Sequence, residues 1–259
     1  ASTMPRKAIC LLLITLLLVT ACSRLTFVRP KGKMGQLDGQ EELPDYSVGD
    51  SPEVKRRQSV QTILARTLQR LQAGQLEAAE KDARSALKLA PDSVDALTLL
   101  AVIEDRQGRH DKAGQSYRRA AELAPNVGAT QNNYGTWLCN NGFAAESLVW
   151  FDRAIGAPGY DTPGAAAANA GSCALKSGQK ERAARDLRQA LALDGGNAVA
   201  LEAMAELEFT QQQYMSARAF VERRLAAAPA SAAVLKLASQ IEERLGDKAA
   251  ASRYVQRIR

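Results

Sequence analysis

Residues Val94 to Asn126, VDALTLLAVIEDRQGRHDKAGQSYRRAAELAPN, contain the pattern that decides the fold. Large apolar and small residues recur in this stretch at intervals of three and four, which is the spacing of one face of an α-helix. Gly108 interrupts the pattern near the middle, and Pro125 ends it. Because glycine closes a turn between helices and proline does not continue a helix, the stretch predicts two helices joined as a hairpin.

The pattern recurs along the chain with a period of 34 residues, which is the separation of Pro91 and Pro125. It resembles the tetratricopeptide repeat (TPR), whose large apolar, small, glycine, aromatic and proline positions are matched by Leu97, Leu100, Ala101, Gly108, His110, Ala113, Tyr117, Ala120 and Pro125. Six units begin near Val60, Val94, Gly128, Gly164, Ala198 and Ala232. One hairpin cannot bury its apolar face alone, so the array predicts an all-α fold, a right-handed TPR superhelix of about six helix-turn-helix repeats.

Residues 1–21 have the features of a signal peptide. Arg6 and Lys7 precede an uncharged run of about 14 residues, which is shorter than the roughly 20 residues of a membrane-spanning helix. Residues 1–3 precede Met4 and are interpreted as upstream sequence. The run ends at Val19–Cys22, which resembles the lipobox of bacterial lipoproteins; the alternative is an ordinary signal peptide with an incidental cysteine. The resemblance implies that Cys22 is lipidated and that the anchor lies in the periplasmic leaflet of the outer membrane.

The segment 22–50 is expected to be a flexible tether that follows the lipidated cysteine. It contains six glycines and prolines between residues 30 and 49 and has little periodicity. Ser51 and Pro52 then have the character of an N-cap and a first helical residue. We therefore expect the TPR solenoid to occupy residues 51–259, with its first helix beginning about two turns before Val60.

Composition and motifs favour protein binding over catalysis. The chain has 34 Lys and Arg against 28 Asp and Glu, interspersed with one another, and only 5% aromatic residues, which does not favour nucleic-acid binding. The single histidine, His110, stands at a repeat position that is usually aromatic, so we expect it to pack in the hairpin. We find no phosphate-binding loop and no metal-ligand spacing in the sequence, and we predict neither an enzyme nor a cofactor or metal site.

Two cysteines are predicted to form a disulfide. Cys139 and Cys173 stand late in the first helices of the adjacent third and fourth units. Neighbouring first helices pack side by side, and a secreted chain meets an oxidising environment. The alternative is a pair of buried free thiols.

A partner is expected to bind along the first helices, at repeat positions 2, 5, 9, 12 and 13. These positions hold Gln61, Leu64, Leu68, Leu71 and Gln72 in the first unit, and Asp95, Thr98, Val102, Asp105 and Arg106 in the second. Leu64, Leu68 and Leu71 predict an apolar stripe that Val102 extends; alternatively, the leucines pack against neighbouring helices. In the third and fourth units, Asn132, Asn133 and Asn169 have amides suited to holding an extended backbone.

The assembled features resemble the type IV pilus biogenesis lipoproteins called PilF or PilW. The resemblance rests on the lipobox, the six units and two strings, Asn132–Gly135 with Leu138–Cys139, and Asn169–Cys173. It implies an outer-membrane pilotin that binds subunits of the pilus secretin and promotes their localisation and multimerisation. We expect the part outside the membrane to be monomeric. The alternatives are a general envelope TPR scaffold for cell-wall or outer-membrane assembly and a regulatory subunit of an envelope enzyme.

Overall fold

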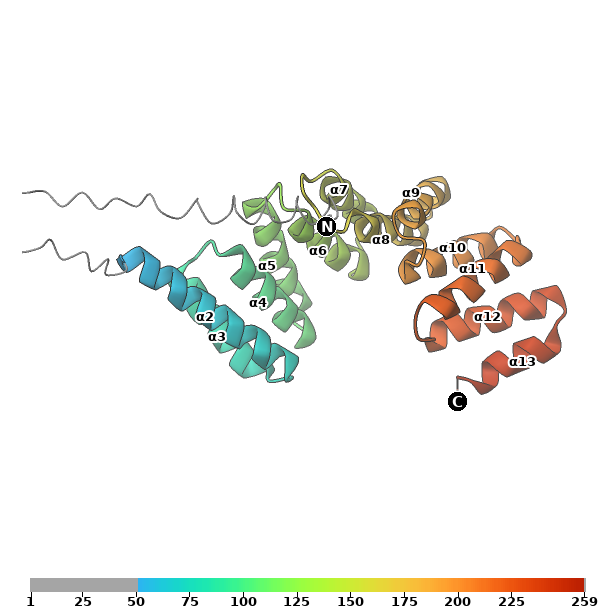
Figure 1. The fold of residues 1–259 in the computed structure, drawn as a ribbon, viewed down its shortest axis with the longest axis horizontal. Coiled ribbons are helices and arrows are strands. Elements are labelled where there is room, and N and C mark those ends of the chain that lie inside the picture. The colour runs from blue at the N-terminus through green and yellow to red at the C-terminus, as the bar shows by residue number, and fades with distance from the viewer. Residues whose placement is uncertain (1–50, 259) are drawn as a thin grey trace, which may run out of the picture. The chain divides into compact units, whose positions relative to one another are not determined.

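The computed structural model describes residues 51–258, so the predicted signal peptide (1–21), the lipidation of Cys22 and the tether (22–50) lie outside the described residues. All regular structure from residue 51 to 258 is helical, and twelve helices form six hairpins (Figure 1). They are α2 (Pro52–Gln72), α3 (Leu76–Leu89), α4 (Val94–Arg106), α5 (His110–Leu123), α6 (Gly128–Asn140), α7 (Ala144–Ile155), α8 (Pro163–Lys176), α9 (Lys180–Leu193), α10 (Ala198–Thr210), α11 (Tyr214–Ala227), α12 (Ala232–Leu245) and α13 (Lys248–Gln256). The predicted all-α TPR fold is confirmed.

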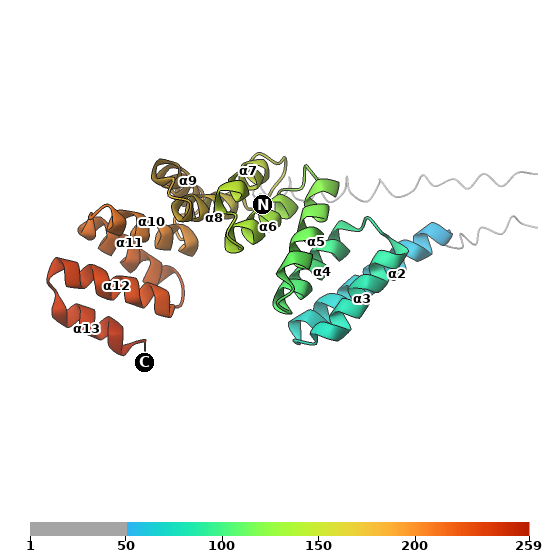
Figure 2. The same cartoon turned by 180° about the vertical axis from the view of Figure 1, so that it is seen from behind.

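Each hairpin packs against the next in chain order, as Figure 2 shows from behind. The second helix of one hairpin contacts the first helix of the following one, from α3 with α4 to α11 with α12. Helix α2 begins early because Ser51 caps it: the Ser51 hydroxyl accepts a hydrogen bond from the Val54 N–H, and Pro52 occupies the first turn, where a missing N–H costs nothing.

The two helices of a hairpin approach closely at small residues. Alanines of facing helices, such as Ala101 with Ala113 and Ala205 with Ala217, are fully buried. In the fourth hairpin the small residue is Gly171 of α8, and a Cβ added there would overlap the side chain of Leu187 in α9. These contacts leave a core of apolar side chains that runs through the stack from one hairpin to the next.

The turn inside each hairpin needs one residue with left-handed backbone. Glycine supplies it in five hairpins, for example Gly108 at a φ of 75° and Gly178 at 77°. In the fifth hairpin the equivalent residue is Gln212, with a φ of 62°, and it is the only non-glycine residue between 51 and 258 with a positive φ. A side chain with a Cβ is strained in this conformation by roughly 1 kcal/mol.

Replacing Gln212 with glycine is therefore expected to stabilise the protein by up to about 1 kcal/mol, because it relieves the strain at this turn. Urea unfolding followed by circular dichroism would show a higher midpoint. The neighbour Gln211, which has a φ of −88°, is the control. Gln211→Gly should leave the midpoint unchanged or lower it, and an equal rise in both variants would contradict the assignment of strain.

The third and fourth units begin 36 residues apart, and the structure shows what the longer connection does. The segment between α7 and α8 carries Tyr160, whose ring covers Gly128 at the beginning of α6. A Cβ on Gly128 would overlap that ring, so only glycine fits at this position without a shift of Tyr160.

Ion pairs connect the first hairpin to the second. Glu80 of α3 accepts hydrogen bonds from Arg84 at 2.9 Å and from Arg109 at 2.5 Å. Arg84 also donates to the buried carboxylate of Glu104 in α4 at 2.9 Å. The hydrogen bond from Arg109, supported by that from Arg84, outweighs the desolvation of Glu80 and lowers the pKa of its carboxyl to about 2.

Because the pKa of Glu80 is lower in the folded state than its usual 4.5, the charged carboxylate stabilises the fold above pH 4.5. This contribution is lost as the pH falls from 4.5 towards 2. Glu80→Gln should therefore flatten the fall of unfolding free energy in that window, by a slope on the order of 1 kcal/mol per pH unit, measured by urea unfolding at a series of pH values. Glu77→Gln, at an exposed carboxylate of the same helix, should keep the wild-type slope. An unchanged slope in Glu80→Gln would contradict the lowering of the Glu80 pKa by its ion pair with Arg109.

Candidate partner-binding groove

A groove of about 460 Å³ lies along the first helices of the first three hairpins. Helix α2 lines it with Gln61, Leu64, Ala65 and Leu68, α4 with Val94, Asp95, Thr98 and Leu99, and the beginning of α6 with Val127, Ala129, Thr130 and Asn133. We call this the α2–α4–α6 groove. Its lining is predominantly apolar, although its walls are open to solvent.

The three leucines predicted as an apolar stripe have different positions in the structure. Leu68 lines the groove and is 45% exposed. Leu64 also lines the groove, but it is only 7% exposed because it packs with Val60 in the core beneath. Leu71 does not line the groove, and with 4% exposure it belongs to the core around Ile103. The prediction that Leu71 faces the groove is wrong, since the turn that follows brings α3 and α4 against it.

Val102 and the three asparagines also lie in different environments. Val102 is half-buried against the core cluster of Leu71 and lies outside the groove lining. Asn132 and Asn169 bind each other, because the Asn169 amide donates to the Asn132 Oδ1 at 3.0 Å across α6 and α8. Asn133 lines the groove and makes no side-chain hydrogen bond within residues 51–258. Within residues 51–258, Asn133 is therefore the one of the three asparagines whose side-chain amide is free to bind a partner.

A second cavity of about 120 Å³ continues from the groove towards the carboxyl ends of α4 and α6. It is lined by Asp105, Tyr117, Asn133, Thr136, Trp137, Asn140 and Asn141. Burial, with a smaller contribution from the Asp105 carboxylate, raises the pKa of Tyr117 to about 12. Its hydroxyl group, like that of any tyrosine at neutral pH, is protonated and can donate a hydrogen bond.

Aromatic side chains cluster beside this cavity, between α5 and α6. The indole of Trp137 lies directly on Gly114 of α5, where any Cβ would overlap it. Tyr134 stacks beside Trp137 with ring centroids 6.1 Å apart, and Tyr117 packs against the same cluster. The backbones of α4 and α6 approach less closely than those of the other neighbouring first helices.

His110 is not packed inside its hairpin, contrary to the sequence prediction. It is the first residue of α5, its side chain is 55% exposed, and its Nδ1 lies 2.8 Å from the Asp105 Oδ1. The α4–α5 turn beside it is closed by backbone hydrogen bonds, such as the one from the Arg109 N–H to the Glu104 carbonyl.

The sequence did not single out Val127, which lines the groove, or Tyr117 and Trp137, which line the second cavity. Val127 lies in the turn before α6 and is 48% exposed, and periodicity has no signal for a turn residue. Tyr117 and Trp137 follow the repeat pattern of core positions, so only their three-dimensional neighbours reveal that they also border a cavity.

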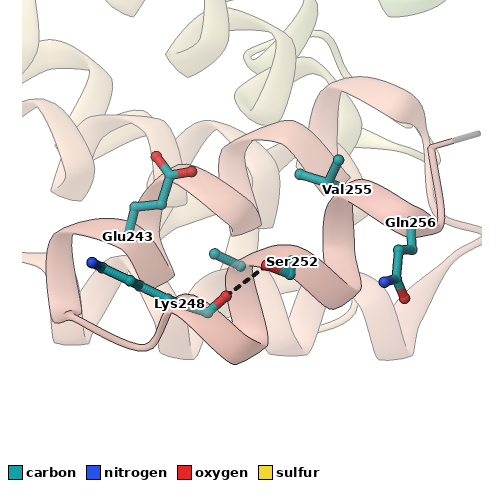
Figure 3. A pocket seen from close by; sticks show the side chains of 6 residues that line it. Glu243, Lys248, Ser252, Val255 and Gln256 are labelled. Carbon is teal, nitrogen blue, oxygen red and sulfur yellow. Dashed lines mark hydrogen bonds between the residues drawn. The ribbon is translucent and has the colours of Figure 1, made fainter.

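A larger cavity, of about 550 Å³, lies on the last hairpin (Figure 3). Glu243, Lys248, Ser252, Val255 and Gln256 surround it, and the Ser252 hydroxyl is bound to the Lys248 carbonyl at 2.9 Å. These side chains are exposed and mostly polar, which is typical of the outer face of a terminal repeat. Because it is lined by a single hairpin, we assign this cavity to the end of the array and not to a binding site.

Within residues 51–258, no group of three or more His, Cys, Asp and Glu is arranged to hold a metal ion. The same part of the chain contains no helix that is both long and apolar enough to cross a membrane.

Cys139 of α6 and Cys173 of α8 form a disulfide in the structure, with their Cα atoms 5.9 Å apart. It connects the third and fourth hairpins on the side of the first helices, beside the hydrogen bond between Asn132 and Asn169. The bond closes a loop of 34 residues and so restricts the unfolded chain.

Alkylation without reductant should leave the peptides that contain Cys139 and Cys173 unmodified, and reduction should make both reactive, as measured by mass spectrometry. Replacing both cysteines with serine should lower the unfolding free energy by about 3 to 4 kcal/mol, the loop-entropy estimate for a closure of this length. Two alkylated cysteines in the untreated protein would contradict the bond.

Comparisons with known proteins agree with this architecture. The family model described as tetratricopeptide repeat matches residues 65–127, which include most of the groove. No curated protein matches the sequence significantly.

Several solved structures are similar to the described part of the chain. The crystal structure of PilW, a widely conserved type IV pilus biogenesis factor, is 28% identical, covers 78% of this chain and 92% of its own, and has a TM-score of 0.72. Pseudomonas aeruginosa pilF is 23% identical over 79% of this chain and 92% of its own, with a TM-score of 0.70. YrrB, a TPR protein with an unusual peptide-binding site, has 16% identity, covers 71% of this chain and 94% of its own, and has a TM-score of 0.54. The described part of the chain therefore has the TPR-repeat fold and is similar in structure to PilW.

Proposed function

We propose that this protein is an outer-membrane lipoprotein pilotin, which binds subunits of the type IV pilus secretin through the α2–α4–α6 groove and promotes their localisation and multimerisation. The similarity to PilW supports the pilus assignment. The lipobox at Cys22 supports the membrane anchor, and the segment 22–50 would give the solenoid its reach.

The observation that carries the proposal is the exposure of apolar side chains inside the groove. Leu68 and Val127 come from different hairpins, are each almost half exposed, and line the same groove. Apolar side chains that gather in a groove, instead of scattering over the surface, mark a place where a partner buries them. A secretin subunit that places an apolar segment here would be held near the membrane until neighbouring subunits assemble.

Leu68→Asp is expected to abolish secretin multimers, because a charge in the groove removes an apolar contact worth roughly 1.5 to 3 kcal/mol and requires desolvation of a carboxylate. Multimers would be measured by gel electrophoresis of cell envelopes. Leu68 is exposed in the free protein, so the variant should keep the helical circular dichroism signal of the wild type.

The matched control is Leu89→Asp, at the last residue of α3, which is 39% exposed and outside the groove lining. It should leave the multimers intact. Normal multimers in Leu68→Asp would contradict the groove assignment. Capture from detergent-solubilised envelopes of cell-wall enzymes or outer-membrane assembly proteins, with no secretin, would favour the envelope scaffold instead.

A further inference from the structure

The α2–α4–α6 groove and the second cavity lie in line along the same two helices. The groove is lined by Asp95 and Thr98 near the beginning of α4, and the second cavity by Asp105 near its end. On α6 the order is the same, since Ala129 lines the groove and Asn140 lines the second cavity. Asn133 lines both. A linear ligand parallel to α4 and α6 would therefore pass from one cavity into the other across Asn133.

The two ends of this path differ in their chemistry. Leu68 and Val127 make the first end mainly apolar, although the exposed carboxylate of Asp95 also borders it. At the second end, Asp105 has no ion pair with Lys or Arg of residues 51–258, and only His110 contacts its carboxylate, at Oδ1. The adjacent Arg106 donates instead to the Leu71 carbonyl, in the first hairpin.

Helix termini strengthen the negative character of the second end. Helix α4 ends at Arg106 and α6 ends at Asn140, so the carboxyl termini of both helices lie beside the second cavity. The carboxyl end of a helix dipole carries partial negative charge, which attracts a cation. The Oδ2 of Asp105 and the Tyr117 hydroxyl are groups that a bound Lys or Arg and its backbone can use.

Asn133 indicates the conformation of the ligand. Its amide is free within the described part of the chain, whereas that of the neighbouring Asn132 is held by Asn169. A side-chain amide can pair with the N–H and C=O of an extended backbone, but a helical ligand has already used those groups internally. The position of Asn133 between the cavities therefore favours an extended segment.

We propose that the segment bound in this path is an extended peptide with aliphatic side chains in the α2–α4–α6 groove and a Lys or Arg at Asp105. This inference rests on the proposed function, whose partner it describes chemically. Asp95 and Asp105 are ten residues apart on one helix, which corresponds to about 15 Å. An extended chain covers this distance in about four to five residues. The partner segment therefore separates its aliphatic residues from its basic residue by that number of positions.

The test is selection of peptides from a random display library on the full 259-residue chain in mild detergent. The wild-type protein should enrich peptides with aliphatic residues four to five positions from a Lys or Arg. Asp105→Asn should remove the preference for the basic residue and keep the preference for aliphatic residues. It should lower the affinity for the best peptide about two- to fivefold. A synthetic peptide with norleucine in place of the basic residue should bind the wild type and Asp105→Asn equally. Asp111→Asn, at an exposed acid outside both cavities, should behave as the wild type.

The outcomes separate this inference from the function on which it rests. Enriched peptides without a basic residue, or with aliphatic residues at helical spacing, would overturn the inference, as would equal binding of the basic peptide by the wild type and Asp105→Asn. In each case, loss of peptide binding in Leu68→Asp would still support the α2–α4–α6 groove as the binding site. Unchanged binding in Leu68→Asp would contradict the proposed function itself, as would a library from which nothing is enriched.

Discussion

The architecture depends on the close approach of two helices within each hairpin. That approach requires residues with little or no side chain where the helices cross, as at Ala101 with Ala113 and at Gly171 against Leu187. Since interiors are packed without voids, even one added methyl group at such a crossing must displace its neighbour. A hairpin closed in this way leaves apolar surface on both sides, and stacking buries it.

The contacts between neighbouring first helices are less uniform than the contacts within hairpins. The side of the first helices around α8 is built from alanine, glycine and cysteine, including Ala167, Ala170 and Cys173, and α8 and α10 pack closely there. The backbones of α4 and α6 approach each other less closely. The groove and the second cavity lie along these two helices.

The acidic side chains also divide into two groups, those paired with arginines and those open to a ligand. Most buried acids are paired with arginines in the contacts between helices, as Glu104 is with Arg84 and Glu242 is with Arg218. Such pairs cost free energy if one partner is removed, and they fix how neighbouring helices meet. Asp105 lies outside this network among residues 51–258, beside an open cavity and at the negative end of two helices. Its charge is therefore available to a ligand in a way that those of Glu104 and Glu242 are not.

The sequence alone determined the fold class, the starts of the hairpins and the small residues at their crossings, because each follows from a local period and from turn and capping preferences that act within a few residues. It also placed Leu68 in the groove, since that residue follows the groove register of a first helix, whereas Asn133, which lines the groove too, lies one position outside that register. The burial of Leu71, the pairing of Asn132 with Asn169 and the exposure of His110 were decided only by tertiary structure. Each of these depends on a side chain from another helix or turn, and the repeat pattern of the sequence does not identify such individual neighbours. The groove has the same origin: its lining comes from three hairpins, and which of their side chains meet is a property of the packed chain.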